Sequence, residues 1–423
     1  MKKDDRFCLI GNPLGHSFSK EIHTRLGCFY DLVQLEESEL EKFAKKGSYD
    51  GFNVTIPFKQ KILPYMNCLD ESAKQTGAVN TVVRRNGRLV GYNTDFKGIL
   101  FALKRASIEI KGKKAAILGS GGTSATAKAV VQSLNARETV VISQLGQNNY
   151  SNLDQHFDSE VVINTTPVGM FPENKGELID LDDFFLLEGV LDVVYNPLRT
   201  NLVLKAENDG IHCSGGLPML VAQAFYSREI FTGEPALIED IERFLTQFQK
   251  EKENIVLVGM PGSGKTTIGK EVAKRLHRDF VDTDDLVVSK GSALPKALRS
   301  IPVIFGEGEE LFRQLECEAV ADCAKKFSGV IATGGGAVLD ERNVNALRQN
   351  GIVFYLERKP DFNNCSTDRP LVGCLEDLEY LHETRQPYYE QAADFVVSND
   401  GTVEECVSKI ANCSVQITNA AEN

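Results

Sequence analysis

Residues 259–266 have the types and spacing that bind phosphate groups. They read Gly-x-x-x-x-Gly-Lys-Thr, follow the apolar run 254–258 and lead into a helical pattern. In such a loop the glycines let backbone N–H groups surround the phosphates, the lysine reaches the β- and γ-phosphates, and the threonine hydroxyl binds Mg²⁺. The neighbouring strand and helix patterns favour this P-loop interpretation over a chance glycine-rich turn. The predicted nucleotide contacts are Gly262, Ser263, Gly264, Lys265, Thr266 and Thr267.

Two carboxylates follow this loop at the end of a second strand-like run. Asp282 and Asp284 are two residues apart in a segment that we expect to be extended. Residues at that spacing in a strand point to the same side, so both should face the site beyond the P-loop. A solvated acidic loop is the alternative for an isolated pair. Motifs further along the chain favour the first interpretation.

Four such motifs lie downstream in a fixed order. They are Gly-Glu-Glu-Leu-Phe-Arg at 308–313, Gly-Gly-Gly at 334–336, Asp-Arg-Pro-Leu at 368–371 and Thr-Arg-Gln-Pro-Tyr-Tyr at 384–389. Together with the P-loop and the acidic pair, they make residues 254–410 resemble shikimate kinase. The resemblance implies transfer of a phosphoryl group from ATP to shikimate, with Mg²⁺ as the metal.

The same resemblance implies roles for residues around the transferred phosphate. Asp284 would hold the shikimate hydroxyls and accept the proton, while Thr266 and Asp282 would bind Mg²⁺, the latter through water. Arg369 would lie on a lid and reach the ATP phosphates as the lid closes. The stretch before 308 is one residue shorter than the family's usual spacing, and the lid at 360–369 is compact. The adenine contacts therefore stay unassigned.

Two arginines and two glycines would bind the rest of shikimate. By the resemblance, Arg313 and Arg385 clamp the substrate carboxylate, a planar anion that suits guanidinium groups. Gly335 and Gly336 would let the backbone approach the sugar-like ring.

An earlier glycine-rich loop, 119–122, is a weaker signal by itself. It follows the apolar run 114–118 and opens a small-residue helix, as a dinucleotide-binding turn does. The third glycine of the usual pattern is missing, however, and no acidic residue follows at the distance typical of NAD sites. A structural turn is the alternative.

Motifs on both sides of this loop favour the dinucleotide-binding turn over a purely structural one. They occupy residues 11–20, 51–59, 77–81, 91–95, 164–170, 192–197 and 215–223. In this order they make residues 6–248 resemble shikimate dehydrogenase, which implies reduction of 3-dehydroshikimate to shikimate. The implied substrate contacts are Ser17, Ser19, Thr55, Asn80, Asp95, Tyr195 and Gln223. The implied cofactor contacts are Gly119, Gly121, Gly122, Thr123 and Gly216, with Tyr195 and the 215–216 turn beside the nicotinamide ring.

The resemblance makes Lys59 and Asp95 the catalytic pair, and the reaction needs such a pair. Reduction of a keto group requires a hydride at carbon and a proton at the developing alkoxide. An ammonium group can stabilise that oxygen and supply its proton, while a carboxylate orients both partners. The alternative is that Lys59 is a surface lysine and Asp95 a turn residue.

The cofactor prediction rests on a departure from the family. Shikimate dehydrogenases usually have an Asn-Arg-Thr triplet after the second strand of the nucleotide fold, where cations hold the 2′-phosphate of NADP. Here Gln144 stands at the arginine position, and residues 143–152 include no basic or acidic side chain. We therefore predict NADP(H) as the cofactor, with weakened discrimination against NAD(H).

The elements that must position these residues predict an α/β fold. Strand-like runs at 139–142, 160–163 and 190–194 are spaced for helical crossovers, which is typical of a doubly wound parallel sheet. We expect a substrate domain plus a Rossmann-like dinucleotide domain, followed by a P-loop kinase domain with a parallel sheet. The predicted boundaries are 1–248 for the dehydrogenase (1–105 and 224–248 for substrate, 106–223 for dinucleotide), 249–253 for a linker, 254–412 for the kinase and 413–423 for a disordered tail.

The composition sets limits on partners and location. The net charge of −12, from 47 basic and 59 acidic residues, and the absence of a basic stripe argue against nucleic acid or an anionic membrane as partner. No apolar stretch approaches the roughly 20 residues that span a bilayer, and no signal segment opens the chain. The ten cysteines are scattered, which favours reduced thiols and a cytoplasmic enzyme acting on small molecules.

Two other functions fit parts of this pattern. A metabolite-sensing regulator built from degenerate enzymes should have lost Lys59, Asp95, Lys265 or Asp284, and all four are present. An enzyme acting on quinate keeps the same residues, but a kinase partner favours shikimate because the product of one half is then the substrate of the other. The sequence leaves open a homo-oligomer, the packing of the halves and direct transfer between them.

Overall fold

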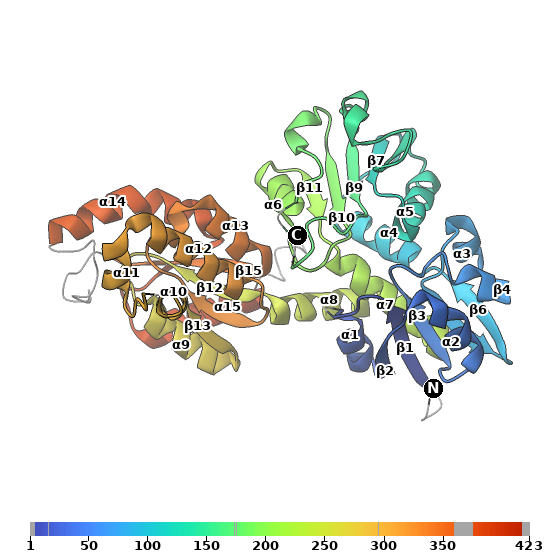
Figure 1. Cartoon of the computed structure of the whole chain (residues 1–423), viewed down its shortest axis with the longest axis horizontal. Coiled ribbons are helices and arrows are strands. Elements are labelled where there is room, and N and C mark those ends of the chain that lie inside the picture. Colours follow the sequence, from blue (N-terminus) through green and yellow to red (C-terminus); the bar gives the residue numbers. More distant parts are fainter. Residues whose placement is uncertain are drawn as a thin grey trace. The chain divides into compact units, whose positions relative to one another are not determined.

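The computed structural model describes residues 5–15, 17–172, 174, 176–294, 296–358 and 375–416. The chain forms two compact units, Met1–Leu245 and Thr246–Asn423, which we describe separately (Figure 1). The predicted ATP contact Arg369, the lid segment 360–369 and residues 417–423 of the predicted tail lie outside the described residues. No helix within the described ranges is both long and apolar enough to cross a membrane.

A six-stranded mixed sheet opens the first unit. Its strand order is β2-β1-β3-β5-β6-β4, with β1 parallel to both neighbours and β5 antiparallel to β3 and β6. Residues 7–10 of β1 are all buried, so both faces of this strand are covered. The elements are β1 (Arg6–Gly11), α1 (Ser19–Arg25), β2 (Phe29–Gln34), α2 (Leu40–Lys46), β3 (Gly51–Val54), β4 (Cys68–Leu69), α3 (Glu71–Thr76), β5 (Thr81–Arg85), β6 (Arg88–Tyr92) and α4 (Asp95–Arg105).

A five-stranded parallel sheet completes the first unit. Its strand order, β11-β10-β9-β7-β8, is that of a doubly wound fold, in which ligands bind beyond the carboxyl ends of the strands where the order reverses, here beside β7. Residues of β7 alternate between two apolar clusters, Ala115 and Ile117 in one and Ala116 and Leu118 in the other. The elements are β7 (Lys114–Leu118), α5 (Gly122–Ser133), β8 (Glu138–Ile142), β9 (Val161–Asn164), β10 (Gly189–Asp192), α6 (Asn201–Asn208), β11 (His212–Ser214) and α7 (Leu217–Thr232).

The second unit contains another five-stranded parallel sheet, ordered β13-β14-β12-β15-β16. In β12, Ile255 and Leu257 pack with α9 and α15, whereas Val256 and Val258 pack with α12, α13 and α14. Helices therefore cover both faces, and the P-loop follows the central strand. The elements are β12 (Asn254–Val258), α9 (Lys265–Leu276), β13 (Asp279–Asp282), α10 (Thr283–Ser292), α11 (Ile301–Glu307), α12 (Glu309–Ala324), β14 (Gly329–Ala332), α13 (Glu341–Asn350), β15 (Gly351–Glu357), α14 (Leu375–Ala392), β16 (Phe395–Ser398) and α15 (Val403–Gln416).

The structure differs from the predicted boundaries at two places. The linker predicted at 249–253 is helical through Lys252, because α8 (Ile238–Lys252) runs through it. Its buried side chains Ile241, Leu245 and Phe248 keep a helical spacing up to that point, so the charged residues that follow extend the same helix. Likewise, α15 continues to Gln416, so the tail predicted from residue 413 begins as helix.

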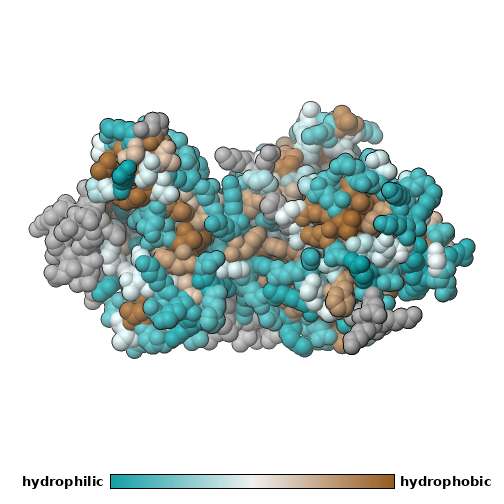
Figure 2. All heavy atoms as spheres, turned by 60° about the horizontal axis from the view of Figure 1, so that its bottom comes forward, coloured by the Kyte–Doolittle hydropathy of each residue, from teal (hydrophilic) through white to brown (hydrophobic). Residues whose placement is uncertain are grey.

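Exposed apolar side chains come from many elements rather than from one. On the face drawn in Figure 2, brown apolar residues gather in several patches surrounded by hydrophilic ones. Among the described residues the largest exposed examples include Phe29 on β2, Leu145 after β8 and Tyr380 on α14. Single exposed apolar residues are normal on protein surfaces, and none of these lies among the predicted site residues.

Candidate functional site

The structure brings Lys59 and Asp95 together as a buried ion pair. Lys59 Nζ lies 2.6 Å from Asp95 Oδ2, and the two side chains are 13% and 6% exposed. Lys59 follows the turn after β3, and Asp95 is the first residue of α4. Asp95 therefore lies both beside an ammonium group and at a helix N-terminus, where a negative charge interacts favourably with the helix dipole.

Asn80 fixes the orientation of this carboxylate. Its amide nitrogen donates to Asp95 Oδ1 at 2.8 Å, and its amide oxygen accepts from the backbone N–H of Thr94 at 2.7 Å. The backbone N–H can only donate, so the amide cannot flip without losing both bonds. Asn80 was predicted to contact the substrate, and here it also holds Asp95 of the ion pair in place.

A closed ring of three buried hydroxyls lies behind Asn80. The oxygens of Thr81, Thr94 and Ser227 are 2.9–3.1 Å apart. Asn53 donates to Thr81 and Ser227, and Thr94 Oγ1 is 3.5 Å from Oε1 of Gln223. The ring therefore links the predicted substrate contact Gln223 on α7 to Asn80.

Of the predicted substrate contacts, Thr55 directly follows β3, Ser17 lies between β1 and α1, and Ser19 begins α1. Ser17 Oγ accepts from Ser19 N at 3.2 Å, and Thr55 N donates to the carbonyl of Ile10 at the end of β1. Burial raises the pKa of Tyr195, and a hydrogen bond with Ser17 opposes that shift. The structure thus places Tyr195 against Ser17.

The glycine-rich loop after β7 presents open backbone to a ligand. Gly119 has φ +108°, and a Cβ there would lie 2.8 Å from Thr165 Oγ1, whereas a Cβ on Gly121 would meet nothing within 4 Å. Gly122 and Thr123 lie against Lys59, with Thr123 Oγ1 3.1 Å from its Nζ. The predicted contact Gly216 caps α7 and leaves no space for a side chain.

A buried carboxylate supports the segment that carries Tyr195. Asp192 accepts hydrogen bonds from the Thr200 hydroxyl at 2.6 Å, the Val194 N–H at 3.0 Å and the Asn164 amide at 3.0 Å. Burial raises the pKa of Asp192 to about 7, and these three hydrogen bonds oppose the shift. Asp192 therefore ties residues 192–200 into a fixed turn.

In the second unit two glycines of the predicted P-loop adopt the left-handed backbone conformation that suits glycine. Gly262 and Gly264 have φ of +83° and +94°. Lys265 Nζ donates to the carbonyls of Gly259 and Met260 at 2.7 and 2.8 Å, which places the ammonium group over the loop. The buried hydroxyl of Ser263 has no hydrogen-bond partner among the described residues. A phosphate oxygen would supply that partner, so the loop fits a nucleotide.

Of the acidic pair after β13, Asp282 is extended but Asp284 is helical, contrary to the prediction. Asp282 ends β13 and caps α10, where its Oδ1 accepts from Asp284 N at 3.0 Å, and Asp284 lies in the first helical turn. The two acids therefore have different structural positions, since Asp282 is the N-cap of α10 and Asp284 is part of the helix. Asp282 Oδ2 accepts from the Thr266 hydroxyl at 2.8 Å, so the two predicted metal ligands are adjacent.

The predicted shikimate residues gather around the glycine triplet. A Cβ on Gly334 would lie 2.7 Å from Asp284 Oδ1, and a Cβ on Gly336 would lie 2.4 Å from Arg313 Nη1. Arg385 Nη1 donates to the Gly335 carbonyl at 3.3 Å. A side chain in place of Gly334 or Gly336 would therefore force Asp284 or Arg313 to move.

A further carboxylate in this cluster was not predicted. Glu316 Oε2 accepts from Arg313 Nη1 at 2.7 Å, and its Oε1 is buried without a partner among the described residues. Burial raises the pKa of Glu316, Arg313 opposes the shift, and Asp284 adds to it. The Arg-x-x-Glu spacing on α12 was the available sequence signal, since residues three apart share a helix face.

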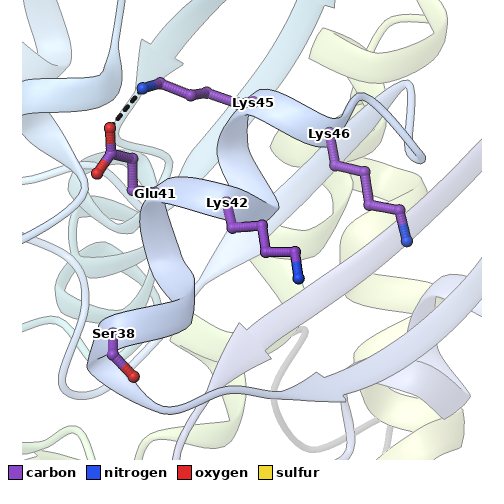
Figure 3. Close-up of a pocket in the computed structure, with 5 residues that line it drawn as sticks. All are labelled: Ser38, Glu41, Lys42, Lys45 and Lys46. Carbon is purple, nitrogen blue, oxygen red and sulfur yellow. Dashed lines mark hydrogen bonds and ion pairs between the residues drawn. The ribbon is translucent and has the colours of Figure 1, made fainter.

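The hollow in Figure 3 is separate from both groups of residues. It is lined by Ser38, Glu41, Lys42, Lys45 and Lys46, and Lys45 is already paired with Glu41. No predicted site residue lines it. These surface lysines belong to neither candidate active site.

The two groups of residues define a nicotinamide-dependent dehydrogenase and a P-loop phosphotransferase in one chain. Residues 9–82 match the shikimate dehydrogenase substrate binding domain, and residues 261–414 match shikimate kinase. Over 249 residues the chain is 32% identical to shikimate dehydrogenase (NADP(+)) of Clostridium perfringens, covering 54% of this chain and 92% of that protein.

Two solved structures resemble the same part of the chain. One is a chorismate mutase/shikimate 5-dehydrogenase fusion protein from Clostridium acetobutylicum, with 27% identity, a TM-score of 0.55 and coverage of 58% of this chain and 97% of that one. The other is shikimate 5-dehydrogenase from Thermus thermophilus in complex with NADP(H) and shikimate, with 27% identity, a TM-score of 0.52 and coverage of 57% and 99%.

The chain belongs to the shikimate dehydrogenase family through its N-terminal part and continues into a shikimate kinase domain. The predicted α/β fold class and the pairing of these two shikimate-pathway enzymes are thereby confirmed. The roles of individual residues stay predictions.

Proposed function

We propose that Lys59 is the proton donor in an NADPH-dependent reduction of 3-dehydroshikimate to shikimate. The observation that supports this role is the buried Lys59–Asp95 ion pair beside the glycine-rich loop. NADPH, when bound, would supply the hydride to the keto carbon and leave as NADP⁺. Lys59 stabilises the negative charge that develops on the oxygen, and one of its N–H bonds breaks as the new O–H bond forms. Asp95 keeps the ammonium group in place, and Lys59 regains a proton from the solvent, so that each reduction consumes one NADPH and one solvent proton.

The residues around the glycine-rich loop fit a dinucleotide. Gly121 leaves the backbone open at the N-terminus of α5, where an anionic phosphate is favoured. We assign NADP(H) because the relatives carry NADP(+) in their names. The segment 143–152 after β8 adds no cation to hold a 2′-phosphate, so discrimination against NAD(H) should be weak.

In the kinase domain we assign proton acceptance to Asp284 and binding of the shikimate carboxylate to Arg313 and Arg385. The supporting observation is that Asp284, Arg313 and Arg385 surround the glycine triplet. ATP supplies the γ-phosphoryl group. As the shikimate hydroxyl bonds to phosphorus and the bond to ADP breaks, its proton passes to Asp284, while Lys265 stabilises charge on the phosphates.

Thr266 and Asp282 would hold Mg²⁺. One hydroxyl and one carboxylate are 2.8 Å apart, which suits an ion that keeps several waters and binds substrate phosphates. Among the described residues, no group of three or more acidic, histidine or cysteine side chains could enclose a metal. The ion would therefore bind together with ATP rather than in a separate protein site.

Separate assays on the purified chain test this proposal. NADPH oxidation should require 3-dehydroshikimate, and ADP release should require shikimate and Mg²⁺. Turnover of quinate with NAD(P)⁺ at a rate equal to that of shikimate would favour the quinate alternative. No NADPH oxidation, or ADP release independent of shikimate, would refute the assignment of that half.

A further inference from the structure

The glycine-rich loop touches the proposed proton donor directly. Lys59 Nζ donates to Thr123 Oγ1 at 3.1 Å in addition to its bond with Asp95. A Cβ on Gly122 would lie only 3.0 Å from Lys59 Cβ, so the loop packs closely along the lysine stem. Gly122 and Thr123 begin α5, whereas Lys59 follows β3 in the other sheet of the same unit. The residues predicted to bind the cofactor therefore also form one wall around Lys59.

A second hydrogen bond holds the same turn of α5 against the substrate residues. Asn93 Nδ2 donates to Thr126 Oγ1 at 3.0 Å, and it also donates to Thr76 Oγ1 and the Ala78 carbonyl. Thr126 is three residues after Thr123 and so shares its helix face. Among the described residues, the contact between Lys59 and Thr123 is thus accompanied by a second side-chain hydrogen bond between α5 and the substrate part. It is not an isolated contact of a flexible side chain.

We propose that Thr123 is a positioning residue for Lys59, beyond any contact that it makes with the cofactor. An ammonium group has three N–H bonds. Asp95 accepts one and Thr123 accepts another, which leaves the third for the substrate oxygen. After that proton is transferred, the two remaining N–H bonds still point to Asp95 and Thr123, so the nitrogen lone pair keeps facing the new hydroxyl. Such alignment of the reacting atoms contributes directly to rate.

The test compares Thr123→Val, which keeps the shape and removes the acceptor, with Thr123→Ser, which retains a hydroxyl. This proposal rests on the proposed role of Lys59. We expect Thr123→Val to lower kcat for 3-dehydroshikimate reduction about tenfold, the scale of one hydrogen bond to a charged group. KM and Kd for NADPH should stay within about threefold, since the phosphate-facing backbone is untouched. Thr123→Ser should restore most of kcat.

Two controls show that the effect passes through Lys59. Ser133→Ala removes a hydroxyl at the other end of α5, where it donates to the Val130 carbonyl at 2.7 Å, and should leave kcat unchanged. In a Lys59→Ala background, Thr123→Val should have no further effect on reduction, because residues that act through one another are not additive. The kinase activity of every variant reports on the integrity of the purified chain.

Three results would overturn the proposal. Unchanged kcat in Thr123→Val would remove the residue from lysine positioning. A raised KM and Kd for NADPH with intact kcat would make it a cofactor contact alone. Full reductase activity in Lys59→Ala would overturn the role of Lys59 itself, which separates that failure from a failure of Thr123.

Discussion

Lys59→Ala should slow reduction severely and also destabilise the first unit, for two separable reasons. Loss of the proton donor should lower kcat for 3-dehydroshikimate by about a hundredfold or more. The substitution also leaves Asp95, whose side chain is 6% exposed, without its ammonium partner. Breaking a buried ion pair costs about 3–5 kcal/mol. We expect about 3 kcal/mol, because Asn80 and the N-terminus of α4 still compensate the charge.

A double variant separates the two effects. Lys59→Ala with Asp95→Asn removes the uncompensated charge, so the free energy of unfolding should recover to within about 1 kcal/mol of wild type while reduction stays lost. Urea unfolding followed by circular dichroism measures stability, NADPH absorbance measures reduction, and ADP release measures the kinase. Reduction near the wild-type rate in Lys59→Ala would refute the assignment. Equal loss of kinase turnover would mean that the two halves do not act independently.

Three other substitutions probe the remaining assignments. Asp284→Asn should keep ATP binding and lose phosphoryl transfer, and unchanged turnover would remove Asp284 from the mechanism. Gln144→Arg should tighten NADPH binding by about 1–3 kcal/mol with little effect on NADH, measured as kcat/KM for each; a wild-type preference for NADPH above roughly a thousandfold would contradict it. Burial raises the pKa of Asp192 to about 7 in the folded protein, above its value of about 4 in the unfolded chain. The contribution of Asp192 to the free energy of unfolding is therefore complete below about pH 4 and is lost as the pH rises through about 7. Asp192→Asn should remove up to about 4 kcal/mol of this change in the free energy of unfolding between about pH 4 and 8. The same pH dependence of unfolding in the variant and in the wild type would refute this.

The sequence was sufficient for features that depend on local residue types. A strand followed by Gly-x-x-x-x-Gly-Lys-Thr specifies its own backbone, and β12, the loop and α9 appear where they were predicted. The order of motifs was enough to bring Lys59 next to Asp95 and Arg313 next to the glycine triplet. Each of these contacts joins two short motifs whose residue types had already indicated the reaction.

Features that depend on tertiary contacts were missed. Ser227 lies more than 130 positions after Thr81 and Thr94 in the chain. It joins their hydroxyl ring only because α7 packs against this part of the first sheet. The extended form expected for Asp284 was wrong because Asp282 caps a helix, a common role for aspartate that the strand pattern concealed. A polar, charge-rich stretch after a predicted amphipathic helix suggested a linker at 249–253, whereas α8 continues through Lys252 and buries Phe248.

The most direct test of the two-enzyme account is formation of shikimate 3-phosphate from 3-dehydroshikimate by the purified chain, followed by mass spectrometry. With NADPH, ATP and Mg²⁺ the wild-type chain should make the product. Lys59→Ala should stop at 3-dehydroshikimate and Lys265→Ala at shikimate, and a mixture of the two variants should restore the product because shikimate diffuses between them. Shikimate 3-phosphate from Lys265→Ala alone, or NADPH oxidation by the wild type without any phosphorylated product, would contradict the account.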